Sequence, residues 1–275
     1  MEFFTIAGGV SVHVWDTRDE GAQGKCLVLL HGYLETMYIY NELIDALKAH
    51  YRIITLDLPG HGLTDSAPAG ADGVRVNSLA FQAQVVAGVM DKCGVQKAII
   101  AGHSMGGYVT LRFLHDFPER AERGILLHSH PWPDAPEKAE DRAREKVLIR
   151  AGKLQALAAY SIPKMYHEDN LRACDEKIRE TIELCETHDP EGIIAVIEGL
   201  RTRPDQQDVM AKPPVPLMLV HGDHDDFLPL DRVAEMKKAF PQVQYELIPE
   251  TGHNSFIERR DAVVEIMTDS RSSRD

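Results

Sequence analysis

The 275-residue sequence predicts an α/β fold built on a mostly parallel sheet, and two observations carry this prediction. First, five short runs are almost continuously apolar, which is typical of strands buried on both faces of a parallel sheet. Second, segments with helical periodicity follow most of these runs, and such alternation indicates repeated strand–helix–strand units. The five runs are Cys26–Leu30, Ile53–Leu56, Ala98–Ala101, Gly124–Leu127 and Leu217–Val220.

Helices and further strands are expected around these runs. Phe3–Ile6 and Val10–Trp15 flank the pair Gly8-Gly9, so we expect an antiparallel hairpin at one edge of the sheet. Val243–Ile248 is the last expected strand, which brings the sheet to eight strands. The expected helices are Asn41–Ala49, Ser78–Cys93, Met105–Phe117, Leu230–Phe240 and Ser255–Met267.

The alternation of strands and helices stops in the stretch 131–213, where helix-start signals replace strand patterns. Asp134 followed by Glu137 resembles a capping box, Asn170 is an expected N-cap, and Asp189-Pro190 is expected to open another helix. A helical insertion between two strands of a sheet suggests a cap over the carboxyl edge of that sheet.

The sequence therefore predicts three parts. Residues 1–130 and 214–268 form the α/β core, residues 131–213 form the helical cap, and residues 269–275 form a disordered tail because they are polar throughout.

Charge and hydropathy exclude several classes of partner. Acidic residues number 43 against 30 Lys and Arg, which gives a net charge of −13. Nucleic acids and anionic membranes select basic surfaces, so we expect neither as a partner. No apolar run approaches the roughly 18 residues that a spanning helix needs. Glu2 occupies a position where a secretion signal carries Lys or Arg, so we expect a cytoplasmic protein.

The four cysteines are too few and too scattered for a disulfide scaffold or a zinc site. We expect Cys26, Cys93, Cys174 and Cys185 to be buried thiols in the core.

The first chemical signal is Gly102-His103-Ser104-Met105-Gly106-Gly107, which joins an expected strand to an expected helix. A sharp strand–turn–helix with small neighbours raises a serine hydroxyl above the sheet as a nucleophile. The helix N-terminus behind the serine also favours developing negative charge. Ser104 is therefore the candidate nucleophile.

A serine hydroxyl needs a neighbouring base, and that base needs an orienting carboxylate. The last two expected strands lead into such residues, because HGDHDDFLP follows at 221–229 and His253 follows Gly252. The carboxyl ends of parallel strands lie at one edge of the sheet, which is also where Ser104 is expected. The residues alone leave three candidate acids in this stretch, namely Asp223, Asp225 and Asp226.

A third signal, His31-Gly32-Tyr33-Leu34-Glu35, follows the first parallel strand. Gly32 lets the backbone turn back toward the serine. The backbone N–H groups of Tyr33 and Met105 can then form an oxyanion hole for a tetrahedral intermediate.

These motifs resemble those of the α/β-hydrolases, in particular the small bacterial serine esterases. The resemblance covers nearly the whole chain except the expected cap, and the order serine, acid, histidine agrees with that family. It implies the α/β-hydrolase fold, a mostly parallel eight-stranded sheet flanked by helices with an inserted helical lid. The motifs that carry it are HGYLE at 31–35, DLPGHGLTD at 57–65, GHSMGG at 102–107, GDHDDFLP at 222–229 and GH at 252–253.

The resemblance implies a catalytic triad of Ser104, Asp225 and His253. The family pattern G-x-x-D-x-x-x-P matches Gly222, Asp225 and Pro229, which selects Asp225 among the three acids. The implied activity is cofactor-free hydrolysis of a small-molecule carboxylic ester through an acyl-enzyme, by a monomer or homodimer. Residues expected to line the substrate pocket are His103, His130, Trp132, Tyr160, Met165, Tyr166, Phe227 and Leu228.

Several alternatives stay open at this stage. The same triad can cleave a thioester, a lactone or a C–C bond, and lyase or perhydrolase chemistry is also possible. A non-catalytic member of the fold that binds a ligand is a more remote alternative. His128 and His130 have a metal-ligand spacing, but the acidic stretch at 221–226 does not match a metallo-hydrolase motif, so we expect no metal.

Overall fold

Eight strands form one sheet within residues 1–20 and 24–268, the part of the chain that the computed structural model describes. Their order across the sheet is β1-β2-β4-β3-β5-β6-β7-β8. β1 with β2 and β2 with β4 are antiparallel pairs, and the other pairs are parallel. This is the predicted sheet. The strands are β1 (Glu2–Ala7), β2 (Val10–Asp16), β3 (Cys26–Leu30), β4 (Arg52–Leu56), β5 (Ala98–His103), β6 (Ala121–Leu127), β7 (Leu217–Gly222) and β8 (Gln244–Ile248).

The inner strands explain why their sequences are so uniformly apolar. Every residue of β3, β5 and β7 is buried. Successive residues of a strand point to opposite faces, so Val28 packs into one hydrophobic cluster while Leu27 and Leu29 pack into another. The sheet thus has a core on each face, and every position of an inner strand needs an apolar side chain.

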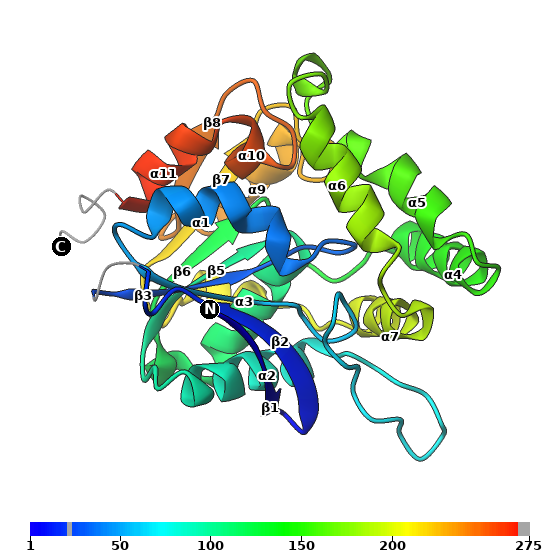
Figure 1. The fold of residues 1–275 in the computed structure, drawn as a ribbon. Coiled ribbons are helices and arrows are strands. Elements are labelled where there is room, and N and C mark those ends of the chain that lie inside the picture. The colour runs from blue at the N-terminus through cyan, green and yellow to red at the C-terminus, as the bar shows by residue number, and fades with distance from the viewer. Residues whose placement is uncertain (21–23, 269–275) are drawn as a thin grey trace.

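Helices cover both faces of the sheet (Figure 1). Val85, Val109 and Val233 are buried in the first cluster, and they belong to α2 (Leu79–Lys92), α3 (Met105–Asp116) and α9 (Leu230–Ala239). Leu43 and Val263 are buried in the second cluster, and they belong to α1 (Asn41–Leu47) and α11 (Arg260–Thr268). Two short 3₁₀ helices lie between these elements, η1 (Met37–Tyr40) and η2 (Pro118–Arg120).

The last expected helix is in fact two helices. α10 (Ser255–Glu258) ends where Arg259 leaves the helical region, with φ −138° and ψ 51°, and α11 starts at the next residue. The Glu258 carboxylate accepts hydrogen bonds from the backbone N–H groups of Gly252 and His167, each at 2.9 Å. These bonds anchor the end of α10 to two loops, a tertiary constraint that the local sequence does not reveal.

The segment between β6 and β7 is helical, with no strand among its residues, all of which the structure describes. Figure 1 shows α4 to α7 as a group beside the sheet. This group has a hydrophobic cluster of its own, to which the core contributes Leu34. The elements are α4 (Pro136–Arg150), α5 (Leu154–Ser161), η3 (Pro163–Met165), η4 (Glu168–Asn170), α6 (Asp175–Cys185), α7 (Pro190–Arg201) and α8 (Gln207–Ala211).

One of the three expected helix starts in this segment is confirmed. Asp189 caps α7, because its carboxylate accepts the N–H groups of Glu191 and Gly192. The capping box at Asp134 was a wrong prediction, since Ala135 is the N-cap of α4 and Asp134 instead pairs with two arginines. Asn170 does not cap α6 either, since its side chain donates to Glu250 O and to Glu258.

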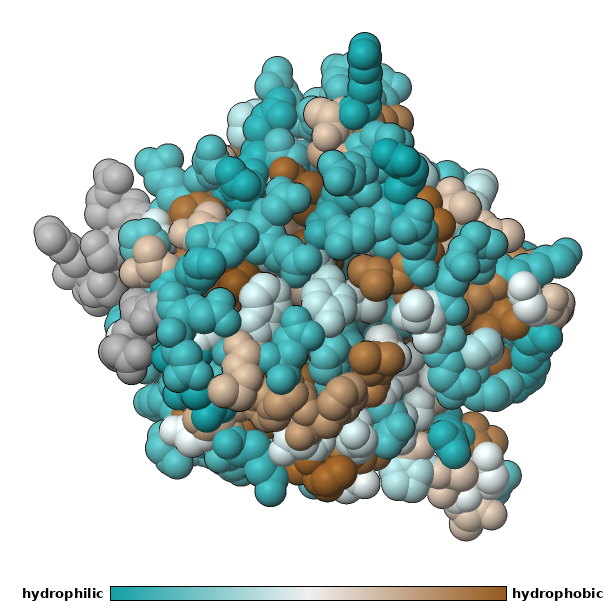
Figure 2. Space-filling model, in the orientation of Figure 1, coloured by the Kyte–Doolittle hydropathy of each residue, from teal (hydrophilic) through white to brown (hydrophobic). Residues whose placement is uncertain are grey.

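Three other expectations concern the surface and the cysteines. All four cysteines are free and buried. No helix among the described residues is long and apolar enough to cross a membrane. The expected disordered tail, 269–275, lies outside the described residues. Figure 2 shows a mainly hydrophilic face, with apolar side chains gathering over the β1–β2 hairpin, where Phe4 and Ile6 are exposed.

Candidate active site

Ser104 lies in the sharp turn between β5 and α3, in the predicted strand–turn–helix setting. Its backbone has φ 49° and ψ −110°, a conformation that costs a non-glycine residue on the order of 1–3 kcal/mol. The turn needs glycine on both sides of the serine. A Cβ on Gly102 would lie 2.1 Å from Gly106 O, and a Cβ on Gly106 would lie 2.1 Å from Leu30 O. Glycine at positions 102 and 106 is thus required by the sharp turn that carries Ser104.

Asp225 and His253 lie in contact at the carboxyl edge of the sheet. His253 Nδ1 donates to Asp225 Oδ2 at 2.7 Å, and the Asp225 side chain is fully buried. Asp225 Oδ1 accepts the backbone N–H groups of Phe227 at 2.8 Å and Leu228 at 3.0 Å. Burial alone raises the pKa of the Asp225 carboxyl, but the attraction and hydrogen bonds of its two histidine neighbours outweigh burial and lower that pKa.

The backbone of His253 is held on both sides. His253 N–H donates to Met165 O at 2.7 Å, and His253 O accepts from His103 Nε2 at 3.0 Å. Met165 belongs to the helical segment between β6 and β7, whereas His103 ends β5. The histidine is therefore positioned jointly by the core and by the inserted helices.

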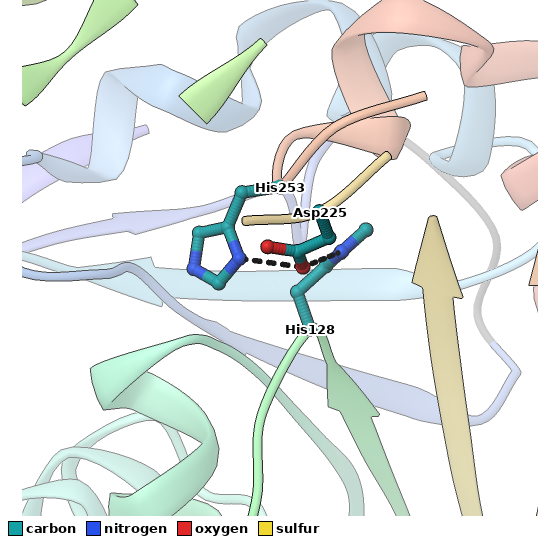
Figure 3. A group of neighbouring side chains, drawn as sticks. All are labelled: His128, Asp225 and His253. Atoms are coloured by element: carbon teal, nitrogen blue, oxygen red, sulfur yellow. Dashed lines mark hydrogen bonds and ion pairs between the residues drawn. The ribbon is translucent and has the colours of Figure 1, made fainter. Parts of the chain in front are cut away.

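His128 is a second histidine on the same carboxylate, and the sequence did not single it out for this role. Its Nδ1 lies 2.9 Å from Asp225 Oδ2 (Figure 3). Its Nε2 lies 2.6 Å from Ser255 Oγ. Burial lowers the pKa of His128 to about 4. The one available signal was its place directly after β6, since β6 neighbours the strand that leads to Asp225.

One nitrogen or oxygen atom from each of His128, Asp225 and His253 lies within 4.8 Å of the others, a spacing that a metal site also requires. Ser255 offers its hydroxyl at 2.6 Å and its backbone N–H at 3.4 Å to His128 Nε2. Since a backbone N–H can only donate, Nε2 is the acceptor and the His128 proton lies on Nδ1, facing Asp225. Hydrogen bonds thus join His128, Asp225, His253 and Ser255 in one network.

His103 was expected in the substrate pocket, but it is buried beneath it. Its Nδ1 lies 2.9 Å from Glu35 Oε2, and neither side chain is exposed. Burial raises the pKa of Glu35, while His103 and the Gly32 N–H, which donates at 2.6 Å, lower it more strongly. Glu35 thereby ties the loop at Gly32 and Tyr33 to the end of β5.

The expected oxyanion-hole residues lie beside Ser104. Tyr33, Met105 and Ser104 all line one cavity. Met105 is the first residue of α3, where backbone N–H groups lack partners within the helix. Neither the Tyr33 nor the Met105 N–H donates a hydrogen bond to another described residue.

A cavity of about 420 Å³ contains both Ser104 and His253 in its lining. Four of the expected pocket residues also line it, His130, Trp132, Met165 and Phe227. The other four do not. Besides His103, these are Leu228, which is buried in the core, Tyr160, which is 67% exposed, and Tyr166, which lines a neighbouring cavity.

The cavity has a polar wall that the sequence did not predict. Asp134 pairs with the buried Arg142 and Arg203, and Glu145 lies 3.6 Å from Arg142, so these charges compensate one another. Lys138 lines the same wall, and the structure gives it no hydrogen bond or ion pair with another described residue. Among the described residues of the cavity lining, Lys138 is thus a cation without an ion-pair partner, and Asp226 is an acid without one.

Comparison with known proteins bears on the family and fold of this chain. A family model described as the alpha/beta hydrolase fold matches residues 25–260. The chain is 25% identical to the 2-hydroxy-6-oxononadienedioate/2-hydroxy-6-oxononatrienedioate hydrolase of Paraburkholderia phymatum, over 90% of this chain and 87% of that protein. It is also 25% identical to the pimeloyl-(acyl-carrier protein) methyl ester esterase of Nitrosomonas europaea, over 90% and 94% of the two chains. A thermophilic esterase from Thermogutta terrifontis, solved with malate bound, superposes with a TM-score of 0.86 at 26% identity and covers 97% of this chain and 96% of its own.

Proposed function

Because the chain belongs to the alpha/beta hydrolase fold family, we propose that it hydrolyses carboxylic esters by a serine mechanism. Ser104 is the nucleophile, His253 the base and Asp225 the carboxylate that orients the base. The relatives that are named esterases support the choice of an ester bond.

The state of the His253 imidazole is the observation that carries this proposal. Its Nδ1 donates to Asp225 at 2.7 Å, whereas its Nε2 is buried and has no hydrogen-bond partner among the described residues. With the proton on Nδ1, Nε2 bears a lone pair, as a general base requires. The side chain lines the same cavity as Ser104, and in this proposal the Nε2 lone pair takes the serine proton during the reaction.

The chemistry follows in two half-reactions. Ser104 Oγ attacks the ester carbonyl carbon, its proton passes to His253 Nε2, and the alcohol leaves with that proton. Water then attacks the acyl-enzyme, gives a proton to His253, and releases the carboxylic acid as Ser104 recovers its proton. The N–H groups of Tyr33 and Met105 stabilise the negative oxygen of both tetrahedral intermediates. Asp225 stabilises the imidazolium that forms in each half-reaction.

The inserted helices act as a cap in this proposal. Residues 131–213 supply much of the cavity lining, including Trp132, Arg142 and Met165. Met165 O also holds the backbone of His253 at 2.7 Å, so the cap contributes to the position of the base.

A fluorophosphonate probe tests the serine mechanism independently of the substrate. We expect wild type to gain one covalent label, as Ser104 Oγ bonds to phosphorus and fluoride leaves, and Ser104→Ala to gain none. Intact-protein mass spectrometry measures both. A wild type that takes up no label would favour the alternative that this chain is a non-catalytic member of the fold that binds a ligand. If wild type is labelled but hydrolyses no ester, the proposed triad stands and the bond that the protein cleaves is a thioester, a lactone or a C–C bond instead.

Lys138 leads to a prediction about substrate charge. The Lys138 ammonium has no ion-pair partner among the described residues, so we propose that it favours esters that carry a carboxylate. Two relatives point the same way, one named for dioates and one solved with malate. We expect Lys138→Met to lower kcat/KM for a dicarboxylic half-ester roughly 3- to 10-fold, since a partly exposed ion pair contributes about 1 kcal/mol. The matched methyl ester without the carboxylate is the control, and equal losses on both esters would contradict the prediction.

A further inference from the structure

We propose that His128 is a positioning residue that donates a second hydrogen bond to Asp225 Oδ2, and thereby limits how strongly Asp225 stabilises protonated His253. The inference rests on the proposed function, because it concerns the base of that mechanism.

The backbone holds His128 rigidly over the acid. His128 follows β6 directly and has a positive φ of 54°, which is uncommon for a residue with a side chain. Its backbone N–H donates to Val220 O of β7 at 2.8 Å. β7 in turn leads to Asp225, so neighbouring strands carry the donor and the acceptor.

The proton of His128 is on the nitrogen that faces Asp225. Ser255 holds Nε2 as an acceptor through its hydroxyl at 2.6 Å and its backbone N–H at 3.4 Å. Nδ1 therefore bears the proton and donates to Asp225 Oδ2 at 2.9 Å. Because burial disfavours the charged imidazole, His128 is a neutral donor across the neutral pH range.

Asp225 consequently accepts four hydrogen bonds. Two come from backbone N–H groups to Oδ1, and two come from imidazoles to Oδ2. Each added donor draws negative charge away from Oδ2, the atom on which His253 depends. Loss of the His128 donor leaves more charge on Oδ2 and favours protonated His253.

Several other titratable groups lie around this pair. His130 interacts electrostatically with His253, and Tyr108 and His221 interact electrostatically with Asp225. The His103 ring lies 4.9 Å from the His253 ring and 6.1 Å from the His128 ring, and Glu35 pairs with His103 on its far side. The His128 and His253 rings are 5.4 Å apart. Asp226 also lines the cavity. These groups are unchanged by a substitution at residue 128, so they do not obscure its effect.

The experiment compares three variants with wild type. His128→Phe removes the donor and keeps an aromatic ring of similar size. His128→Gln restores an N–H donor on a side chain of similar reach. Ser255→Ala removes the hydroxyl that binds His128 Nε2, but leaves the Ser255 backbone N–H and the His128 donor to Asp225. Thermal unfolding and circular dichroism identify the variants that are folded.

The experiment measures the acid limb of the pH profile, that is, the fall in activity toward low pH. It is measured both for kcat/KM on an ester and for the rate of fluorophosphonate labelling. Activity falls on acidification as a histidine base is protonated, typically through roughly pH 6–7. We expect the midpoint of this limb to rise by about 0.5 to 1 pH unit in His128→Phe, to return toward wild type in His128→Gln and to stay in place in Ser255→Ala. Histidine ¹⁵N NMR follows the protonation of His253 directly and needs no activity.

The outcomes separate this inference from the proposed function. The inference is overturned if His128→Phe folds and loses activity while its acid limb and its His253 resonance stay where they are in wild type. His128 would then contribute to packing alone. A wild type that fails to label would overturn the proposed function, while the NMR titration would still decide whether His128 affects His253. A shift of equal size in Ser255→Ala would also count against the inference.

Discussion

Ser104→Ala is expected to lower kcat/KM on p-nitrophenyl esters by roughly 10³-fold or more, one of the two largest effects we expect of a single substitution. The variant removes the atom that bonds to the acyl group, whereas the oxyanion hole and the cavity keep their shape. Alanine occupies the same strained turn, with φ 49°, so the fold should tolerate it. A series of esters from acetate to decanoate, assayed with both proteins, measures the loss and also reports the acyl length that the 420 Å³ cavity accepts.

Ser161→Ala is the matched control, because Ser161 is another serine in the lining of this cavity. We expect it to change kcat/KM by less than about tenfold, since no covalent bond depends on it. An active Ser104→Ala, or equal losses in the two variants, would contradict the serine mechanism.

Asp225→Asn is expected to lower kcat by about 10³- to 10⁴-fold at neutral pH. Asparagine can still occupy the space, but it carries no charge to stabilise the imidazolium of His253. Its amide N–H₂ can also face His253 Nδ1 and favour the tautomer that protonates Nε2, which removes the lone pair that the serine needs. Kinetics on the best ester of the series, with thermal unfolding as the test of folding, measure the effect.

The neighbouring acids provide the controls for this prediction. Asp223 accepts from Thr251 N–H at 3.3 Å and lies 2.8 Å from His224 Nδ1, and Asp226 is exposed. Neither has a hydrogen bond with His253 among the described residues. We expect Asp223→Asn and Asp226→Asn to stay within about tenfold of wild type. A loss at Asp226 as large as the loss at Asp225 would mean that the acid has been assigned wrongly.

Several features of the fold could be predicted because they are local in sequence. Buried parallel strands need apolar residues at every position, so β3, β5 and β7 were recognisable as short runs. The Ser104 turn needs Gly102 and Gly106 within a few residues, so its motif was complete in one hexapeptide. Asp189 caps α7 through N–H groups two and three residues away, which is again a local pattern.

Other features could not be predicted because their partners are distant in sequence. Asp134 has the spacing of a capping residue, but its carboxylate pairs with Arg203, which is 69 residues away, instead of capping the helix. Glu258 interrupts the last helix by binding a loop 91 residues earlier. In each case a charge-assisted bond to a distant partner outweighed a local helix preference of at most about 1–2 kcal/mol.

For the candidate site too, some features could be predicted from the sequence and others could not. The sequence by itself determined the family, the eight-stranded sheet and the residue types that a serine hydrolase needs at the ends of its strands. Only the tertiary structure decided that His128 shares the carboxylate of Asp225 and that Lys138 lines the cavity without an ion-pair partner among the described residues. The physical reason is that strand burial and turn geometry act between neighbours in the chain, whereas hydrogen bonds to Asp225 join residues 97 and 28 positions apart, and only the folded sheet brings them together.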